Sequence, residues 1–525
     1  MPLSRVITNA VEVARRAHRP SPAFTLLVVN LLLFPLTATL FTLAYLRSLP
    51  HVRHSSKRSA QGRTRPGNYS SPKPLTIFIT GVGTPQGLKL ARSFYQNGHT
   101  VIGADFESAG LWSKSCARFS RALHTFYPLS PNSDLETWEN YTREVLTIIR
   151  TKVSSDLFIQ CSNVPNTRVD SHLKSLVERF TRSKVISTCA FGFPFHVAFE
   201  VSTDWMFSDW IEEAGLSLRA KRVHVVKSRA QVHKALGAAG RDAKFAIQLH
   251  SLSSKPQSDM LLPRSTMNET YHIIAGLNIS EKNSWILREL LEGVEYGVDA
   301  VSVGGEVMGC VAYRVLSPRA LPTHTNIHVT PEDSQSRVES IPLASALGRS
   351  LHHFTCEMAL HEALTAHFSL RFIVAEKLTS RGTEQIIYPT SCVPRPSTAM
   401  ALLSPEDGVR RNQAYSMAHR KTGASVEPRM IENHVTDDRA ADPFTKTKAY
   451  NVQHEFSELV VGRLRSPLLD LVKGIFQFCY LLLSPEWKEI RFDVWDPVPS
   501  FWEWQVRWPL QLLAEMKDEM EREKK

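Results

Sequence analysis

The sequence predicts an α/β domain followed by an α+β region, with one apolar helix ahead of both. Three observations lead to this fold class. A charge-free apolar stretch covers residues 23–46. Short apolar strands alternate with helical stretches over 74–200, whereas strands and turns dominate 201–403. At 525 residues the chain is too long for one ordinary core, so two or more domains are expected.

The apolar stretch is long enough to cross a bilayer. As a helix, residues 23–46 would extend about 36 Å, against a hydrocarbon core of about 30 Å. Basic residues from Arg47 to Arg58 follow it directly, as at the end of a retained anchor rather than a cleaved signal peptide. We predict a single transmembrane helix between a basic tail (1–22) and a basic linker (47–73). A buried core helix is the alternative.

The positive charge of the chain is concentrated in this same segment. Residues 1–73 contain eleven Lys and Arg and one acid, Glu12, which is a net +10 of the chain's +11. A nucleic-acid-binding protein carries its basic surface on its folded domain, so this distribution argues against a nucleic-acid partner. Basic residues are more numerous after the helix than before it, which favours a cytosolic C-terminal bulk.

The α/β domain is predicted over 74–200 and begins with a glycine-rich turn. Gly81, Gly83 and Gly87 lie between the first strand and the first helix, and Asp105 ends the next strand. This arrangement is typical of a dinucleotide site. However, the G-x-G-x-x-x-G spacing is one residue longer than the usual fingerprint, and no Tyr-x-x-x-Lys pair follows the first strand. An NAD(P)-binding oxidoreductase is therefore the less favoured alternative to a turn that holds no dinucleotide.

The second region, 201–403, is expected to contain antiparallel strands, including a hairpin that turns at Gly304 and Gly305. Residues 404–465 show little periodicity and are predicted to be a flexible insert and connection. The last segment, 466–525, is amphipathic and rich in Trp. Because Trp is favoured both in protein cores and at membrane interfaces, both packing onto the body and contact with a membrane remain open for this segment.

Three stretches of the second region resemble the ATP-grasp superfamily. SWILRELLEGVEYGVDAVSVGGEV (284–307) resembles the hinge and following hairpin of these enzymes. FSLRFIVAEK (368–377) and IIYPTSCVPRPSTA (386–399) resemble their last two strands. The sequence is most similar to fungal carboxylate–amine ligases linked to specialised metabolism. The resemblance implies an α/β pre-ATP-grasp domain followed by an α+β ATP-grasp fold.

The resemblance also implies a chemistry. In such enzymes ATP phosphorylates a carboxylate, and an amine then attacks the acyl phosphate to give an amide. Lysines neutralise the phosphates, and carboxylate or amide oxygens hold Mg²⁺ between them, because phosphoryl transfer depends mainly on charge neutralisation and positioning. The implied partners are ATP, a small carboxylate and an amine.

Several implied site residues are present in this chain. Glu295 lies where the family's ribose-binding acid lies, and the backbone groups of Glu289, Leu290 and Leu291 would line adenine. Two arginines, Arg314 and Arg395, would face phosphate or carboxylate as the candidate catalytic residues. The simpler alternatives are that Glu295 is a solvated charge and that Arg395 pins its strand to an acid.

Other implied positions are substituted. The two phosphate-binding lysines are replaced by Trp205 and Gln248, and the three metal-binding residues by Arg371, Ser391 and Val393. Hard divalent cations need several oxygen ligands, so no metal site is predicted and a need for Mg²⁺ is doubtful. We therefore expect a degenerate copy with weak ATP binding, in which the Arg371 charge replaces that of the metal.

Two other outcomes remain open. Lys244 is expected on the same strand face as Gln248, so it offers partial rescue of the lost lysines and retained activity. A non-catalytic scaffold at a membrane is the competing function class. The histidines at 352, 353, 361 and 367 have no zinc spacing and are expected to be core or helix-face residues. Cys392 is expected to be a buried thiol rather than a nucleophile.

Overall fold

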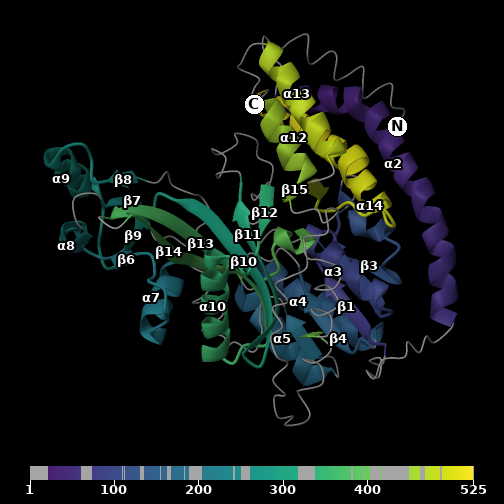
Figure 1. Ribbon diagram of the computed structural model, residues 1–525, viewed down its shortest axis with the longest axis horizontal. Helices are drawn as coiled ribbons and strands as arrows, with labels where there is room; N and C mark the ends of the chain where they lie inside the picture. Colours follow the sequence, from purple (N-terminus) through teal and green to yellow (C-terminus); the bar gives the residue numbers. More distant parts are fainter. Residues whose placement is uncertain are drawn as a thin grey trace. The chain divides into compact units, whose positions relative to one another are not determined.

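The chain forms two compact units in the computed structural model (Figure 1). The first combines Met1–Thr188, Leu316–Ser340 and Pro396–Lys525, and the second combines Cys189–Val315 and Ile341–Arg395. The structure describes residues 22–60, 74–108, 110, 113–130, 135–153, 155–161, 167–181, 184–187, 204–239, 243–249, 260–316, 337–379, 382–393, 395–402, 414–415, 448–461, 468–484 and 487–523.

The first unit contains the predicted parallel sheet. Its strands are β1 (Thr76–Thr80), β2 (Thr100–Phe106), β3 (Thr125–Leu129), β4 (Leu157–Gln160) and β5 (Lys184–Ser187), in the order β3-β2-β1-β4-β5. All paired strands are parallel. The helices α3 (Pro85–Gln96), α4 (Leu135–Thr151) and α5 (Thr167–Phe180) alternate with the strands along the chain. Continuous apolar runs form β1 and β4, whose residues are almost all buried, as in a sheet covered on both faces.

The remaining elements of the first unit come from both ends of the chain. An N-terminal helix, α2 (Pro22–Ala60), precedes the sheet. C-terminal to it in sequence are β12 (Arg337–Ile341), η3 (Thr398–Leu402), β15 (Lys448–Tyr450), α12 (Val452–Val461), α13 (Leu468–Leu483), β16 (Trp487–Glu489), α14 (Val498–Phe501), the π-helical turn η4 (Trp502–Arg507) and α15 (Trp508–Glu523). β15 pairs with β12 in antiparallel and with β16 in parallel orientation.

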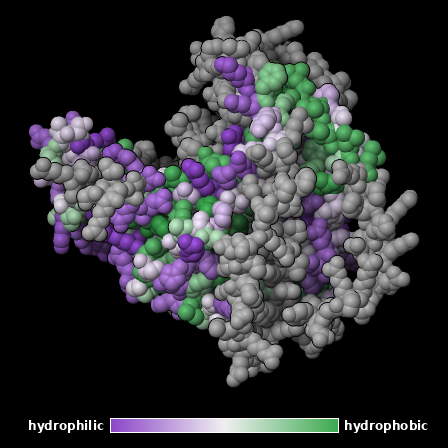
Figure 2. Space-filling view, viewed as in Figure 1, coloured by the Kyte–Doolittle hydropathy of each residue, from purple (hydrophilic) through white to green (hydrophobic). Residues whose placement is uncertain are grey.

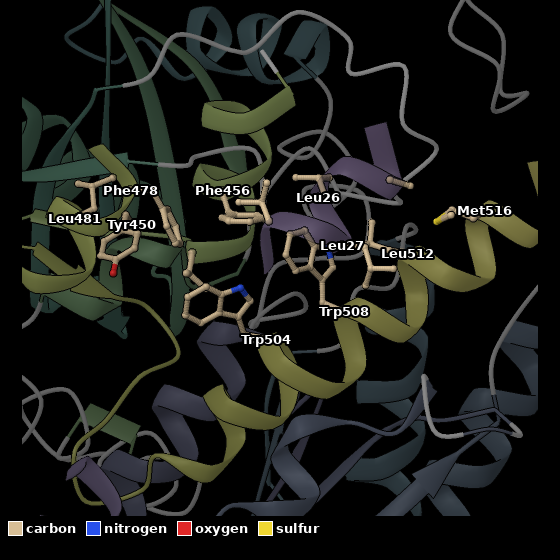
Figure 3. Close-up of a cluster of buried hydrophobic side chains, with 13 residues drawn as sticks. Leu26, Leu27, Tyr450, Phe456, Phe478, Leu481, Trp504, Trp508, Leu512 and Met516 are labelled. Atoms are coloured by element: carbon tan, nitrogen blue, oxygen red, sulfur yellow. The ribbon is translucent and has the colours of Figure 1, made fainter. Parts of the chain in front are cut away.

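An apolar cluster joins α2 to the C-terminal helices (Figure 3). Leu26 and Leu27 of α2 pack with Trp504, Trp508 and other buried side chains of the C-terminal segment. Of the two alternatives for the Trp-rich segment, packing onto the body therefore applies to Trp504 and Trp508. Among the residues that the structure describes, Ala23–Leu46 is the one helical stretch long and apolar enough to cross a membrane.

The second unit contains two groups of antiparallel strands. The smaller sheet has the order β6 (Val223–Val226), β9 (Trp285–Leu290), β7 (Lys244–Leu249), β8 (Met260–Leu262), with helices α8 (Arg229–Ala239) and α9 (Met267–Gly276). The larger group has the order β14 (Gly382–Val393), β13 (Ala366–Thr379), β10 (Val294–Val303), β11 (Glu306–Val315). The helices α7 (Asp204–Ala214) and α10 (Ala346–His361) belong to the same unit.

The β10–β11 hairpin turns as predicted, because Gly304 and Gly305 have φ angles of 60° and 88°, which side chains with a Cβ disfavour. Helix α10 packs on one face of these strands, where the Phe354 and Phe372 rings meet edge to face at 5.8 Å. The opposite face carries the polar residues discussed below. The predicted fold class, an α/β domain followed by an α+β region, is confirmed.

Candidate functional site

The strand register brings together, on one face of the larger sheet, the three residues that the resemblance assigned to metal positions. Arg371 on β13 pairs with Ser391 on β14, and Ser369 pairs with Val393. Paired residues of antiparallel strands share a face, and so do residues two apart on one strand. Arg371, Ser391 and Val393 therefore lie side by side on the face opposite α10, and we call this surface the Arg371 face. It offers a guanidinium, a hydroxyl and an isopropyl group.

Glu295 lies on the same face, next to Arg371. Gly297 of β10 pairs with Arg371, and Glu295 is two residues away along that strand. The Arg371 Nη1 and Glu295 Oε1 atoms are 3.9 Å apart, and the two side chains are 11% and 25% exposed. This distance is an ionic contact that is too long for a hydrogen bond. The guanidinium is thus held near a carboxylate while it remains within reach of solvent.

A tyrosine ring lies beside this pair and depends on a glycine. Tyr313 of β11 pairs with Gly297 and is fully buried. A Cβ at Gly297 would lie 2.3 Å from Cζ of Tyr313, so only glycine leaves room for the ring. Glycine inside a strand often marks such a close approach. Gly297 in the E-Y-G stretch was therefore a sequence signal for a close contact at this point of the strand. Neither that contact nor the Tyr313 ring that makes it was predicted from the sequence.

Further along the same face lies a buried pair, Asp299 and His367. His367 Nε2 and Asp299 Oδ1 are 2.8 Å apart, with side chains 0% and 2% exposed. His367 was expected to be a core or helix-face histidine, and its burial agrees with the core alternative, but its Asp partner was not anticipated. Within the described part of the chain, no group of three or more His, Cys, Asp or Glu side chains is arranged to hold a metal ion.

The smaller sheet presents a second set of candidate residues. On β7, Lys244, Ala246 and Gln248 pair with Leu290, Arg288 and Ile286 of β9. Lys244, Gln248, Arg288 and Leu290 therefore share one face, as expected for the first two of them.

Arg288 is the residue that sequence reasoning missed on this face. Its Nε is buried, with no hydrogen-bond partner among the described residues. The alternation within WILREL, which puts Arg288 on the same face as Leu290, was the signal that could have found it. Lys244 instead contacts Glu292 at 2.8 Å, and this hydrogen bond raises the pKa of the Lys244 ammonium. Trp205 lies in the first turn of α7, and His250 is outside the described residues.

The predicted adenine-lining residues divide between two faces. The Glu289 N–H donates to the Arg222 carbonyl at 2.9 Å, and Arg222 Nε donates to the Glu289 carboxylate at 2.9 Å. Burial alone would raise the pKa of Glu289, but the hydrogen bonds and charge of Arg222 outweigh it and hold this pKa below its usual value. Leu290 lies on the Gln248 face, and Leu291 follows the strand and is half-buried. Glu289 is thus engaged within the sheet.

The two candidate catalytic arginines are not brought together. Arg314 pairs with Tyr296, which in turn pairs with Phe372, so Arg314 lies on the α10 side of the strands, away from Arg371. It is exposed. Arg395 follows β14 and its N–H donates to the Val393 carbonyl at 2.7 Å, with a half-buried side chain. A catalytic role for either arginine stays a prediction.

In the glycine-rich turn of the first unit, the Gly83 amide is bound by the carboxylate of Asp105. The Asp105 carboxylate accepts hydrogen bonds from the Gly83 N–H at 3.0 Å and from the Ser115 hydroxyl at 2.6 Å. Burial raises the pKa of Asp105, although these hydrogen bonds oppose the increase. A Cβ at Gly83 would lie 2.1 Å from Asp105 Oδ2. The amide and the acid that a dinucleotide would need therefore bind each other, which disfavours the NAD(P) alternative.

Comparisons with known proteins show similarity at the level of structure. No family model and no curated protein matches the chain. A biotin carboxylase–β,γ-ATP complex from Campylobacter jejuni matches with a TM-score of 0.46 and 10% identity, over 68% of this chain and 72% of that one. An ATP-bound carboxyaminoimidazole ribonucleotide synthase from Aspergillus clavatus matches with a TM-score of 0.41 and 10% identity, over 64% and 75%.

An L-amino acid ligase from Bacillus licheniformis is also similar, with a TM-score of 0.38 and 9% identity, over 62% of this chain and 67% of that one. At these identities the similarity concerns the fold and says nothing of activity. The fold assignment itself rests on the strand orders described above: a parallel α/β sheet, then a small antiparallel sheet, then the larger antiparallel strands. The ATP-grasp resemblance had implied an α/β domain followed by an α+β region, without these strand orders.

Proposed function

We propose that this chain is a membrane-associated protein with an ATP-grasp fold, related to carboxylate–amine ligases, whose machinery for metal-assisted phosphoryl transfer is degenerate. The observation that carries the proposal is the Arg371 face. Arg371, Ser391 and Val393 occupy neighbouring positions of β13 and β14, at the places where the resemblance implies metal ligands. The grouping of all three substitutions on one surface supports a change in the chemistry of that surface.

The charges on the Arg371 face disfavour binding of Mg²⁺. Mg²⁺ requires near-octahedral oxygen ligands, usually including carboxylates, and a guanidinium within a few ångströms repels it. Glu295 is the one carboxylate in contact with Arg371 among the described residues, and this contact neutralises part of the negative charge of Glu295. Without the metal, and with Trp205 and Gln248 at the two implied lysine positions, a triphosphate loses most of the charge neutralisation that phosphoryl transfer needs. Ligase activity is therefore weak or lost.

Binding of an anion is less affected than catalysis. An arginine fork recognises phosphate or carboxylate oxygens without a metal, and it stays charged at all physiological pH values. Arg371 on the larger sheet and Arg288 on the smaller sheet are two guanidinium groups that could fill this role. We propose weak, Mg²⁺-independent binding of ATP, with a small carboxylate and an amine as substrates only if activity survives.

The second candidate is a non-catalytic scaffold. The substitutions at Arg371, Ser391 and Val393 favour this candidate as well, because they would remove catalysis while the fold could still bind another molecule. In both forms of the proposal, α2 attaches the protein to a membrane, with the C-terminal bulk on the cytosolic side.

The test begins with calorimetric titration of ATP into the full chain, with Mg²⁺ and with a chelator. Equal weak binding in both conditions is expected, together with no turnover of ATP in the presence of pooled carboxylates and amines. Brisk, Mg²⁺-dependent turnover would overturn the degenerate-ligase proposal, and absence of heat in both conditions would leave only the scaffold.

A restoring variant sharpens this test. Arg371→Asp, Ser391→Glu and Val393→Asn together return oxygen ligands to the Arg371 face. We expect the triple variant to bind ATP more tightly with Mg²⁺ than with chelator. The matched control is Arg349→Ala, an exposed change on α10, which packs on the opposite face.

A further inference from the structure

Helix α2 is fixed to the body of the first unit along its apolar length. Near its start, Leu26 is buried against the C-terminal helices. In the middle, Gln505 Nε2 donates to Thr37 Oγ1 at 2.9 Å. Near the end, the Phe41 and Trp504 rings pack with their centroids 6.4 Å apart. The Arg121 guanidinium carbon lies 5.1 Å from the centroid of the Tyr45 ring. These contacts extend from Leu26 to Tyr45, about 28 Å of helix, which is close to the full thickness of a hydrocarbon core.

The surface that receives α2 includes charged side chains near Tyr45. Arg121 also donates from Nη1 to the Trp495 carbonyl at 3.0 Å. Beside it, Asp496 accepts the Arg121 N–H and forms a buried ion pair with Arg92 at 2.9 Å. Charged side chains in hydrocarbon are costly, so this surface does not enter a bilayer with the helix. A helix α2 that crossed the membrane would have to leave all of these contacts.

The opposite side of α2 is apolar and exposed (Figure 2). Leu32 is 73% exposed, Leu43 59% and Leu31 57%. These positions, together with Val28, Leu36 and Leu46, recur at helical spacing and form what we call the outer stripe.

The polar groups along the outer stripe are satisfied within the helix. Thr39 Oγ1 donates to the Pro35 carbonyl and Thr42 Oγ1 to the Ala38 carbonyl, each at 2.7 Å. Internal hydrogen bonding of hydroxyl groups is what a lipid environment requires, because lipid supplies no partners. Exposed Thr147 and Thr151 of α4 make the same kind of bond, each at 2.7 Å, so the arrangement is compatible with lipid but does not by itself select it.

Charge complementarity identifies the occupant of the outer stripe as a membrane with anionic lipids. Six basic residues lie between Arg47 and Arg65, directly after the stripe in sequence. Juxtamembrane basic segments of this kind are attracted to anionic headgroups by about 1 kcal/mol per residue. An interfacial helix normally needs a polar face toward water, but here the protein body covers that side.

We infer that α2 lies in the plane of one leaflet, with the outer stripe in the lipid and its inner side on the C-terminal helices, instead of crossing the bilayer. This inference rests on the proposed membrane attachment. It replaces the spanning anchor by a monotopic one, so both ends of the chain lie on the same side of the membrane.

The decisive experiment is protease protection of the full chain on sealed vesicles containing anionic lipids, with different epitope tags at the two termini. Both tags are expected to be cleaved from outside without detergent. Protection of one tag until detergent is added would show a spanning helix and overturn the inference, while the proposed membrane attachment would stand. Failure to float with the vesicles at all would overturn both.

A variant pair tests the outer stripe itself. Leu32→Asp with Leu43→Asp is expected to reduce flotation with anionic vesicles at least tenfold and to leave the thermal unfolding transition unchanged, because both side chains are exposed. The matched control is Leu261→Asp with Leu360→Asp, two leucines of the second unit that are 50% and 71% exposed. Flotation that falls equally in both pairs, or in neither, would contradict the assignment of the outer stripe. Equal flotation with neutral and anionic vesicles would contradict the charge argument.

Discussion

One arginine–carboxylate pair in each unit shows a difference in distance and in burial. In the first unit, Arg92 and Asp496 are 2.9 Å apart with side chains 3% and 0% exposed, and Ser120 donates a further hydrogen bond to the same carboxylate at 2.6 Å. In the second unit, Arg371 and Glu295 are 3.9 Å apart and partly exposed. The first pair is saturated by its own surroundings, so its role is structural. The second is loosely paired and reaches solvent, so it remains available to a ligand.

This difference in burial determines what happens when one partner of an ion pair is removed. A buried pair that loses one partner leaves an uncompensated charge in the interior. When Arg371 is removed, the carboxylate left behind is that of Glu295, which is 25% exposed and can be solvated by water. Stability experiments should therefore respond strongly in the first unit and weakly at the Arg371 face. Ligand-binding experiments should show the reverse order.

The largest expected effect is that of Arg92→Ala, which strands the buried Asp496 carboxylate. We expect the free energy of unfolding to fall by about 3–5 kcal/mol, measured by chemical denaturation followed through Trp fluorescence. Lys244→Ala is the control, because the Lys244–Glu292 pair is fully exposed and its loss should not change stability measurably. If the double variant Arg92→Met, Asp496→Leu were as unstable as Arg92→Ala, the stranded-charge explanation would be wrong.

The next effect concerns the ring beside Arg371. Gly297→Ala places a Cβ against the Tyr313 ring and should cost about 1–3 kcal/mol of stability through overpacking. Gly309→Ala on the neighbouring strand is the matched control, since a Cβ there meets nothing within 4 Å. Truncation of the ring by Tyr313→Ala in the Gly297→Ala background should remove the clash, and a double-mutant cycle measures this coupling. Additive effects would show that the two positions do not interact.

Removal of the Arg371 guanidinium should affect binding more than stability. Arg371→Ala is expected to weaken ATP about tenfold, or about 1.4 kcal/mol, by calorimetry in chelator. The thermal transition should shift little, because the ionic contact with Glu295 is long and partly exposed. Arg349→Ala serves as the control at an exposed position on α10. Unchanged ATP affinity in Arg371→Ala would assign the nucleotide to another surface.

The smallest effect is a pH dependence. The pKa of Glu289 is held below its ordinary value of 4.5 by Arg222, against the effect of burial. A depressed carboxyl pKa gives stability that is present above pH 4.5 and is lost as the pH falls through the lower, folded-state value. Glu289→Gln should therefore be less stable than the wild type at pH 7, by less than about 1 kcal/mol because Arg222 is partly exposed. In denaturant titrations the gap should close as the pH falls through the lowered, folded-state pKa of Glu289, and a gap that widened with falling pH would contradict the assigned sign.

Much of the fold could be predicted from local patterns. The apolar runs that became β1, β2, β4 and β5, the Gly304–Gly305 turn and the helix α13 are all recorded in residue type and spacing. Such elements follow from burial period and backbone preference, which act over a few residues. The candidate site was less accessible. Arg371, Ser391 and Val393 were found through a resemblance, and the alternation within WILREL could have found Arg288, whereas the Asp299–His367 pair required the strand register.

The sequence by itself determined which elements form and where the charge and apolar length of the chain are concentrated, because these depend on neighbouring residues. Only the tertiary structure decided which face each side chain occupies. It placed Arg314 away from Arg371, tied Asp105 to the Gly83 amide, and packed one side of α2 against the C-terminal helices. The physical reason is that strand register and helix docking are set by the summed burial of residues hundreds of positions apart, and no local pattern records that sum.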